Sequence, residues 1–422
     1  MRISEIKKVC FVGAGTMGCY NSLLAGIAGY DTVVYDISEE ALKGVPAGQE
    51  MMGNFLTAIG TFDGERVTKG RNRIRFETNP ETAAKNADLL SESVFENLDL
   101  KRRIHSQFDE LCPTGTILTT NTSTIMVSEI EDIVRRGDRF AAMHFHLLTP
   151  LVDVVGGPRT STETMDIIRR FVRSLGCVPF TPAKEKGGYV FNNLIPGLNY
   201  AATALVSEYK ENFEDVDRAW MALHKAYFGP FATMDLIGLD VYYNAVKGSL
   251  PNRKETRSAQ MMIDLLQPYM DRGELGMKTG KGFYAYPNPS YGRRGFLTET
   301  NPREDIYKVL ANGVVIRAVQ LAEEGIADFA DIDRIWMINM KSNSGPFAWL
   351  DQKGMDVFLT EIESEERNIL FPEYDRDQVR RFLDPFVKKG QTGIGSGKGL
   401  YTYPNPVFEA ADFLLNPFQP RP

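Results

Sequence analysis

Two histidines one residue apart, His144 and His146, stand in the apolar stretch MHFHLLTPLVDVVGG that covers residues 143–157. An imidazole is the usual general base near neutral pH, because its ordinary pKa lies close to that pH. Alternate residues of a strand point to the same side, so the two rings are expected to share one face. Either ring could act as a base only if the chain also supplies a partner, a cofactor and a substrate contact.

A glycine-rich turn near the start of the chain is typical of a dinucleotide site. Gly13, Gly15 and Gly18 form G-x-G-x-x-G after a short apolar run and before a helical pattern. The first glycine permits a tight turn, the second lets the backbone approach the pyrophosphate, and the third allows close helix packing. Thr16 and Met17 lie in the same turn and belong to the predicted cofactor site.

Asp36 indicates which dinucleotide is bound. It ends the second predicted strand, DTVVYD, where an acid can accept hydrogen bonds from ribose hydroxyls and repel a 2′-phosphate. No arginine follows it in DISEE, so the sequence favours NAD over NADP. The alternative is that Asp36 caps the next helix.

Between this turn and residue 183, strand-like runs alternate with helical ones. ADLLSESV, GTILTTNTS, RFAAMHFH, LVDVVGG and CVPFTPA are typical of strands, whereas LDLKRRIHSQFDELC, VSEIEDIVRRG and TMDIIRRFVRSLG are typical of helices. Alternation of this kind predicts a mostly parallel sheet with covering helices, and ligands bind beyond the carboxyl ends of such strands. Glu96, residues 121–123 and His144 fall at or just past predicted strand ends.

The second half of the chain contains an internal repeat. DRAWMALHKAYFGPFATMDLIGLDVY begins at Asp217, and DRIWMINMKSNSGPFAWLDQKGMDVF begins at Asp333. Residues kept in both copies are expected to serve the framework, and residues particular to the first copy are the catalytic candidates. Asn192 is one of them, because Lys308 takes its place in the second copy, although a polar residue at a helix start is the alternative.

These patterns predict an α/β Rossmann-like domain followed by two tandem all-α domains. The expected boundaries are 1–183 for the dinucleotide-binding domain, 184–296 for the helical substrate and catalytic domain, and 297–422 for a structural second copy. We expect the two Gly-Pro-Phe-Ala segments to pack against each other about a pseudo-two-fold axis.

The composition excludes several classes of protein. The net charge of −7 argues against a nucleic-acid partner, which would require a basic face. The four cysteines form no CxxC pair and no metal spacing, so we expect reduced thiols, no metal and a cytoplasmic protein. The chain start has no apolar leader, and no apolar run approaches the ~20 residues of a membrane span.

GAGTMG, Asp36, FENLDLK, TNTSTI, RFAAMHF and GPFATMDLIGLD, in this order and spacing, resemble the L-3-hydroxyacyl-CoA dehydrogenases. The resemblance spans about residues 7–290, and the second module is similar to the duplicated C-terminal domain of some members. It implies NAD as the cofactor, an acyl-CoA as the small-molecule substrate, and either a homodimer or a monomer with an internal pseudo-dimer.

The resemblance also implies a role for each matching residue. The three glycines would hold the pyrophosphate and Asp36 the ribose. Ser123 and Asn192 would hydrogen-bond the substrate oxygen, and His144 would be the general base. The residues that would lie along the cofactor are Glu96, Lys101 and Asn121.

The chain departs from the family pattern after His144. The family's Asn is replaced by Leu147, and its Glu twelve residues after the base is replaced by Asp153, nine residues on. A loop three residues shorter would restore the strand register, and Asp153 would then accept from one ring nitrogen so that the other can take a proton. A simple strand-end acid is the alternative. His146 falls where the family has an apolar residue, and its role is open.

The leading hypothesis is therefore NAD-dependent oxidation of an L-3-hydroxyacyl-CoA to the 3-oxoacyl-CoA, or the reverse. The altered loop leaves two alternatives: a dehydrogenase of a small free hydroxy acid, such as a carnitine-like or sugar-acid substrate, and a non-catalytic dinucleotide-binding protein.

Overall fold

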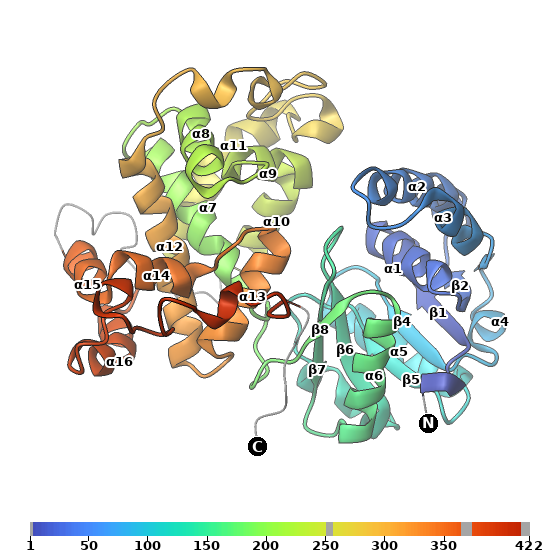
Figure 1. Ribbon diagram of the computed structural model, residues 1–422. Coiled ribbons are helices and arrows are strands. Elements are labelled where there is room, and N and C mark those ends of the chain that lie inside the picture. Colours follow the sequence, from blue (N-terminus) through green and yellow to red (C-terminus); the bar gives the residue numbers. More distant parts are fainter. Residues whose placement is uncertain (1–2, 250–255, 364–373, 415–422) are drawn as a thin grey trace. The chain divides into compact units, whose positions relative to one another are not determined.

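The protein forms two compact units, seen here in a computed structural model that describes residues 3–249, 256–363 and 374–414. The first unit runs to Tyr189, and the second extends from Val190 to Leu414 (Figure 1). The first unit contains the glycine turn and the paired histidines. Both copies of the repeat lie in the second unit.

The first unit is built on an eight-stranded sheet with the order β3-β2-β1-β4-β5-β6-β7-β8. All neighbouring strands run parallel except β6 and β7, which pair antiparallel. This topology confirms the expected Rossmann-like, mostly parallel sheet. The strands are β1 (Lys8–Val12), β2 (Asp31–Tyr35), β3 (Ile74–Glu77), β4 (Leu89–Glu92), β5 (Ile117–Thr120), β6 (Phe140–Phe145), β7 (Leu151–Gly156) and β8 (Val178–Phe180).

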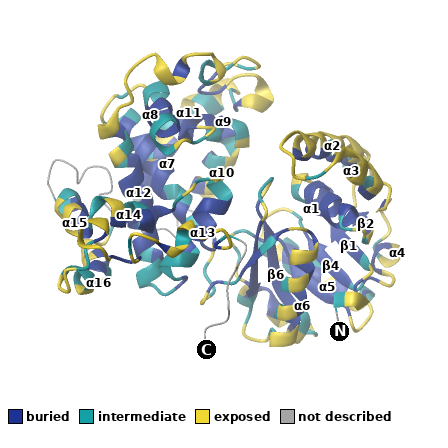
Figure 2. Ribbon diagram, viewed as in Figure 1, coloured by how far each residue is buried: buried dark blue, intermediate teal, exposed yellow. Residues whose placement is uncertain are grey.

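Helices bury both faces of this sheet through two separate hydrophobic clusters. Residues of α1, α2 and α6 belong to one cluster, and residues of α4 and α5 belong to the other. Figure 2 shows the strands buried, with exposed positions on the outer sides of the helices. The helices of the first unit are α1 (Thr16–Ile27), α2 (Glu39–Ala58), α3 (Gly64–Arg71), α4 (Pro80–Ala84), α5 (Leu98–Leu111) and α6 (Thr162–Ser174).

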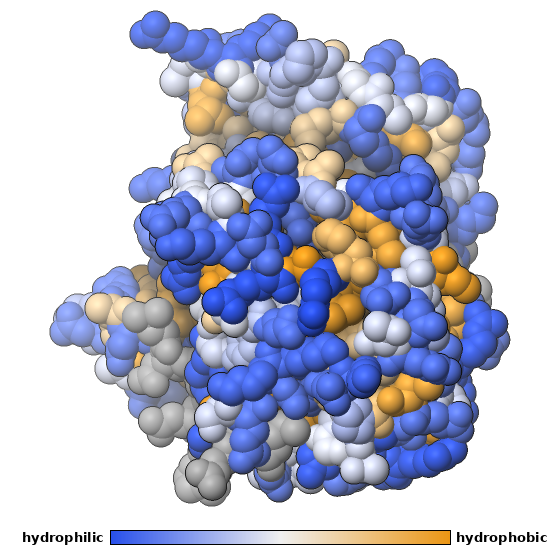
Figure 3. All heavy atoms as spheres, turned by 90° about the vertical axis from the view of Figure 1, so that its right-hand side faces the viewer, coloured by the Kyte–Doolittle hydropathy of each residue, from blue (hydrophilic) through white to orange (hydrophobic). Residues whose placement is uncertain are grey.

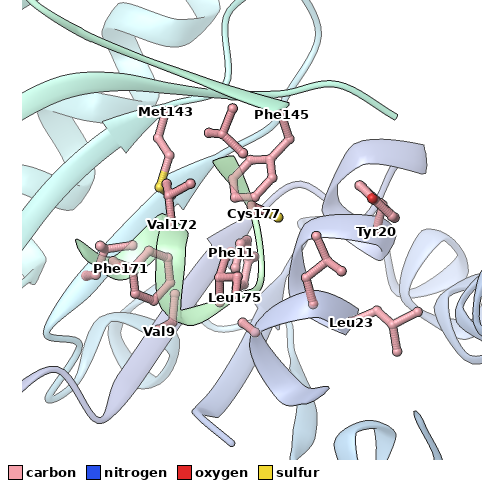
Figure 4. Packing of buried hydrophobic residues seen from close by; sticks show 14 of the residues in the cluster. Val9, Phe11, Tyr20, Leu23, Met143, Phe145, Phe171, Val172, Leu175 and Cys177 are labelled. Atoms are coloured by element: carbon pink, nitrogen blue, oxygen red, sulfur yellow. The ribbon is translucent and has the colours of Figure 1, made fainter. Parts of the chain in front are cut away.

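Strand alternation decides where the candidate catalytic side chains point. Met143 and Phe145 of β6 enter the cluster beneath α1 and α6 (Figure 4). The two valines that flank Asp153 on β7 enter the same cluster. Successive side chains of a strand alternate between faces, so His144 and Asp153 project together from the opposite face.

One predicted helix differs in the structure. The segment VSEIEDIVRRG forms short 3-10 turns, Val127–Glu129 and Glu131–Ile133, in place of an α-helix. The side chains of Glu129 and Glu131 accept backbone hydrogen bonds from Met126 and Arg159, respectively. These local bonds compete with the regular helical pattern.

The second unit is helical and contains both copies of the repeat. Its helices are α7 (Phe191–Ser207), α8 (Phe213–His224), α9 (Pro230–Ile237), α10 (Leu239–Ser249), α11 (Thr256–Arg272), α12 (Glu304–Glu323), α13 (Phe329–Met340), α14 (Pro346–Lys353), α15 (Met355–Glu363) and α16 (Arg376–Val387). The most extensive packing between the copies joins their first helices, α7 and α12. This corrects the expectation that the Gly-Pro-Phe-Ala segments pack against each other.

Close packing of α7 on α12 depends on glycine. A Cβ atom at Gly197 would lie 2.3 Å from the carbonyl oxygen of Gly313, a distance that real Cβ contacts do not reach. The two glycines occupy equivalent positions of the repeat, so the helices cross where neither carries a side chain. The two copies therefore approach through equivalent residues, as a pseudo-two-fold contact requires.

The shared residues of the repeat make the same hydrogen bonds in each copy. Asp217 accepts from the N–H groups of Phe231 and Ala232 at 2.9 and 2.8 Å, capping α9. Asp333 accepts from the corresponding groups that open α14, at 2.7 and 2.9 Å. Each aspartate also accepts from a tyrosine hydroxyl of its own Gly-Lys-Gly segment. These residues hold the fold of each copy.

The surface carries mostly hydrophilic side chains, with small apolar groups between them, on the face shown in Figure 3. Among the described residues, no helix has the length and apolar character needed to cross a membrane. The four cysteines are buried and carry free thiols.

Gly197→Ala should destabilise the protein by about 1–3 kcal/mol, because the added methyl group forces α7 away from α12. Gly248→Ala is the matched control, since nothing lies within 4 Å of a Cβ there. At an exposed helical site, that change should be neutral or stabilising by about 0.5–1 kcal/mol. Urea unfolding measures both, and equal effects of the two variants would contradict the proposed helix contact.

Candidate active site

The glycine turn is shaped by close backbone contacts. Gly13 has φ +106°, and a Cβ there would lie 2.7 Å from the carbonyl oxygen of Ser93. A Cβ at Gly18 would lie 1.8 Å from the carbonyl oxygen of Gly13. No atom lies within 4 Å of a Cβ at Gly15. Gly13 and Gly18 thus allow backbone segments to approach more closely than a side chain would permit, and Gly15 leaves open space beside the backbone.

This open space adjoins the N-terminus of α1. Gly15 is the N-cap and supplies no side chain to the first N–H groups of the helix, which lack partners within it. Thr16 is exposed and Met17 half-buried at the same point. A pyrophosphate fits these features, because the N–H groups and the helix dipole attract anions.

Asp36 is fixed beside the turn. It follows β2, and its carboxylate accepts from the N–H of Ala14 and from the N–H of Ser38, both at 2.8 Å. The carboxylate is half-buried and keeps accepting capacity for a ribose. The helix that follows is capped by Ser38, which disfavours the alternative in which Asp36 caps α2.

A buried ionic cluster lies at the end of β4. Glu92 has no exposed surface, and its carboxylate binds Lys101 Nζ at 2.8 Å, His105 Nε2 at 3.2 Å and Thr120 Oγ1 at 2.7 Å. Burial raises the pKa of Glu92, but the charge of Lys101 and the bond to His105 outweigh it, so the pKa falls to about 2. Sequence reasoning missed Glu92 and His105, because nothing in the local pattern separates them from surface residues of a strand end and a helix.

Lys101 lies behind Glu96 in this cluster. Its side chain is only 1% exposed, and its ammonium lies 3.4 Å from the Glu96 carboxylate. Contact between Lys101 and a cofactor stays a prediction.

Glu96 organises the loop that carries Ser123. Its Oε1 atom accepts from the N–H groups of Ser123 and Thr124 at 2.9 and 2.7 Å and from the hydroxyl of Thr122 at 2.6 Å. Burial raises the pKa of Glu96, but the charge of Lys101 and the hydrogen bonds from Thr122 and Thr124 lower it by more. The pKa of Glu96 therefore lies below its ordinary value. An ionised carboxylate therefore fixes the Asn-Thr-Ser loop.

Asn121 ties this loop to β6. Its Oδ1 atom accepts from the N–H of Phe145 at 2.8 Å, and its own N–H donates to Glu92 O at 2.7 Å. The residue is 8% exposed. Contact between Asn121 and a cofactor stays a prediction.

His144 stands between an acid and a hydroxyl. Its Nδ1 lies 3.0 Å from Asp153 Oδ2, and its Nε2 lies 3.0 Å from Ser123 Oγ. His144 of β6 pairs directly with Asp153 of β7 in the antiparallel register, as the shortened loop predicted. An acid that accepts from Nδ1–H leaves the Nε2 lone pair facing the Ser123 hydroxyl.

The surroundings set the protonation of this pair. Burial lowers the pKa of His144 more than Asp153 raises it, so the pKa falls below 6.5 and the ring is neutral at pH 7. Burial raises the pKa of Asp153, but His146 and His144 together lower it more, so the carboxylate is ionised. The arrangement suits a neutral base whose positive form is stabilised after it takes a proton.

His146 also binds the acid. Its Nε2 lies 2.8 Å from the same Asp153 oxygen, and its ring meets the His144 ring edge-on at 4.6 Å between centroids. The sequence pattern placed both rings on one face, but it did not assign His146 a partner.

The segment after β8 closes over the loop and the base. The N–H of Gly188 donates to Ser123 O at 2.9 Å, and the hydroxyl of Tyr189 donates to Thr122 O at 2.9 Å. The Tyr189 ring lies 5.1 Å from the His144 ring. Sequence reasoning missed Tyr189, although its motif, GGYVFNN, also contains Asn192. Asn192 lies in the first turn of α7 in the second unit, and its predicted role stays a prediction.

Comparisons with known proteins match most of the chain to the domains of one family. The 3-hydroxyacyl-CoA dehydrogenase NAD-binding domain matches residues 8–185, and the C-terminal domain of the same family matches twice, at 188–286 and 309–403. The mitochondrial hydroxyacyl-coenzyme A dehydrogenase of Mus musculus is 30% identical over 293 residues, which cover 67% of this chain and 91% of that protein.

Two solved structures illustrate the likeness. A diketoreductase that acts on dicarbonyl compounds has 33% identity and a TM-score of 0.59, covering 67% of this chain and 99% of its own. The 3-hydroxybutyryl-CoA dehydrogenase of Escherichia coli has 21% identity and a TM-score of 0.73, covering 91% of this chain and 99% of its own. The second likeness concerns the fold and extends over both helical modules.

Asp36→Ala should narrow the preference for NADH over NADPH, because it removes the charge that repels a 2′-phosphate. Fluorescence titration of both cofactors against the unaltered protein and the variant measures the change. Equal affinities in the unaltered protein would contradict this role of Asp36.

Proposed function

The chain belongs to the 3-hydroxyacyl-CoA dehydrogenase family, and we propose that it interconverts an L-3-hydroxyacyl-CoA and the 3-oxoacyl-CoA. It is an oxidoreductase of this type with NAD as its cofactor. The observation that carries the proposal is the continuous line from Asp153 through His144 to Ser123, with both hydrogen bonds at 3.0 Å.

In the oxidation direction, His144 Nε2 takes the proton of the substrate hydroxyl as the carbonyl forms. The NAD that the glycine turn and Asp36 would hold would supply the acceptor for the hydride of carbon 3. The Ser123 hydroxyl would donate to the same substrate oxygen, and Asn192 would add a second donor. The Asp153 carboxylate stabilises the imidazolium that results. In the reverse direction, the same ring returns the proton to the oxygen.

The glycine turn would hold the diphosphate of the cofactor, and Asp36 would hold its ribose. Glu96 would act on the substrate side by keeping the Ser123 loop in place, since it accepts from five groups of that loop. The assigned groups follow the carboxyl ends of β1, β2, β4 and β5 or, as His144 does, lie next to the end of β6, the edge at which α/β sheets bind their ligands.

A second candidate substrate is a small free hydroxy acid or its oxo form. The connection between β6 and β7 supports it, because Leu147 replaces the family's Asn there and is 43% exposed. The loop next to the base therefore carries an apolar side chain where the family has a polar one. The likeness to a diketoreductase at 33% identity supports the same alternative.

Oxidation of NADH, set up in parallel with acetoacetyl-CoA and acetoacetate, distinguishes the two substrates. We expect turnover with the thioester alone. Turnover of the free acid alone would select the small-acid alternative. No turnover with either compound, at any pH at which NADH still binds, would contradict both.

His144→Ala should lower turnover by about a hundredfold or more, the usual scale for loss of a general base, with little change in NADH affinity. In the unaltered enzyme, the oxidation rate should decline only as the pH falls through the lowered pKa of His144, because only the neutral ring accepts a proton. A parallel loss of NADH binding in the variant would assign His144 to the cofactor site instead.

A further inference from the structure

We propose that His146 is a positioning residue whose imidazole keeps the Asp153 carboxylate charged and turned toward His144. The inference rests on the proposed role of His144 as the base. It assigns a task to the second histidine, whose role the sequence left open. Its observed partner at the site is Asp153, at 2.8 Å.

The Asp153 carboxylate has an unusual set of partners. Its Oδ2 atom receives both imidazoles, at 3.0 Å from His144 and 2.8 Å from His146. Its Oδ1 atom makes no hydrogen bond within the described part of the chain, and the residue has no exposed surface. The ring N–H groups of His144 and His146 thus replace water as hydrogen-bond donors to the charged Asp153 carboxylate.

The other neighbours of Asp153 cannot take over this task. Tyr189 donates its hydroxyl to Thr122, and Glu96 carries the same charge as Asp153. On β8, the residue paired with Asp153 is Phe180, which is apolar. The titratable groups named around the acid are thus the two histidines, Tyr189 and Glu96, and within the described residues the second donor to Asp153 is His146.

Loss of the second donor would change the base itself. A buried carboxylate with a single hydrogen bond favours its neutral form, because burial penalises the charge. A protonated Asp153 would donate to His144 Nδ1 and leave the ring proton on Nε2. That tautomer presents an N–H, not a lone pair, to the substrate hydroxyl and cannot accept its proton. His146 thus acts through Asp153 on the tautomer of His144.

The same three residues could in principle bind a cation. His144, His146 and Asp153 each offer a ligand atom, and these atoms lie within 4.8 Å of one another. The hydrogen bonds of 2.8 and 3.0 Å already satisfy these atoms pairwise without an ion. The hydrogen-bonded triad is therefore the simpler arrangement, and the cation becomes an outcome of the test.

Two amide variants separate the donor from the bulk of the ring. In His146→Gln, the amide nitrogen can reach the position of Nε2 and keep the bond to Asp153. In His146→Asn, the amide is too short to reach it, although the polarity is the same. His146→Leu provides a third variant that suits an apolar interior, should the Asn variant fold poorly.

We expect the Gln variant to keep turnover within a few-fold, and the Asn and Leu variants to lose about tenfold or more. In the latter two, the acidic limb of the oxidation profile should move to higher pH. His146 lowers the pKa of Asp153, so its removal allows Asp153 to protonate at higher pH, and each protonation of Asp153 takes away the form of His144 that accepts a proton at Nε2.

Nitrogen-15 NMR of the histidine rings supplies a readout that needs no turnover, and the chain has only four histidines. His144 should carry its proton on Nδ1 in the unaltered protein and the Gln variant, and on Nε2 in the Asn and Leu variants. This measurement separates failure of the inference from failure of the proposed reaction, because it is made without substrate.

Three results would overturn the inference. The first is an unchanged pH profile and His144 tautomer in the Asn and Leu variants, with only a lower melting temperature. The second is equal loss in the Gln and Asn variants. The third is loss of activity in EDTA with recovery on addition of Zn²⁺, which would make the triad a metal site.

Discussion

A carboxylate without contact to water keeps its charge only where hydrogen-bond donors replace that contact. Asp153 meets this condition because the antiparallel pairing of β6 and β7 sets it opposite His144. The apolar residues on the other face of both strands enter the main core and fix this register (Figure 4). The orientation of His144 thus depends on the buried charge of Asp153. The position of that charge depends on the packing of β6 and β7 against the core.

The same condition recurs at the end of β4. Glu92 keeps its charge through Lys101 and His105, and Lys101 also reaches Glu96. Glu96 in turn holds the backbone of the Ser123 loop. Two separate ionised carboxylates therefore position the Ser123–His144 contact: Glu96 holds the loop of Ser123, and Asp153 holds the ring of His144. Because each is held by several donors, the geometry can be set before any substrate binds, which is what preorganised catalysis requires.

The helical unit shows how a duplicated module retains its framework. Asp217 and Asp333 make equivalent bonds to equivalent helices, which accounts for their presence in both copies. The approach of Gly197 to Gly313 uses equivalent positions, so a contact between two copies of one module is made within a single chain.

The sequence by itself determined the class of the fold, the dinucleotide turn and the repeat, because these features depend on local pattern: hydrophobic alternation, glycine spacing, and residues at strand ends. The roles of Ser123, His144 and Asp153 were expectations that came from the resemblance to a family. Only the tertiary structure decided that Lys101 lies behind Glu96, that Glu92 and His105 form a buried cluster, that α7 and α12 make the contact between the copies, and that His146 shares Asp153 with His144. Each of these is either a contact between segments that are distant in the chain or a matter of burial. The identity of a charged residue does not tell whether its side chain is solvated or buried.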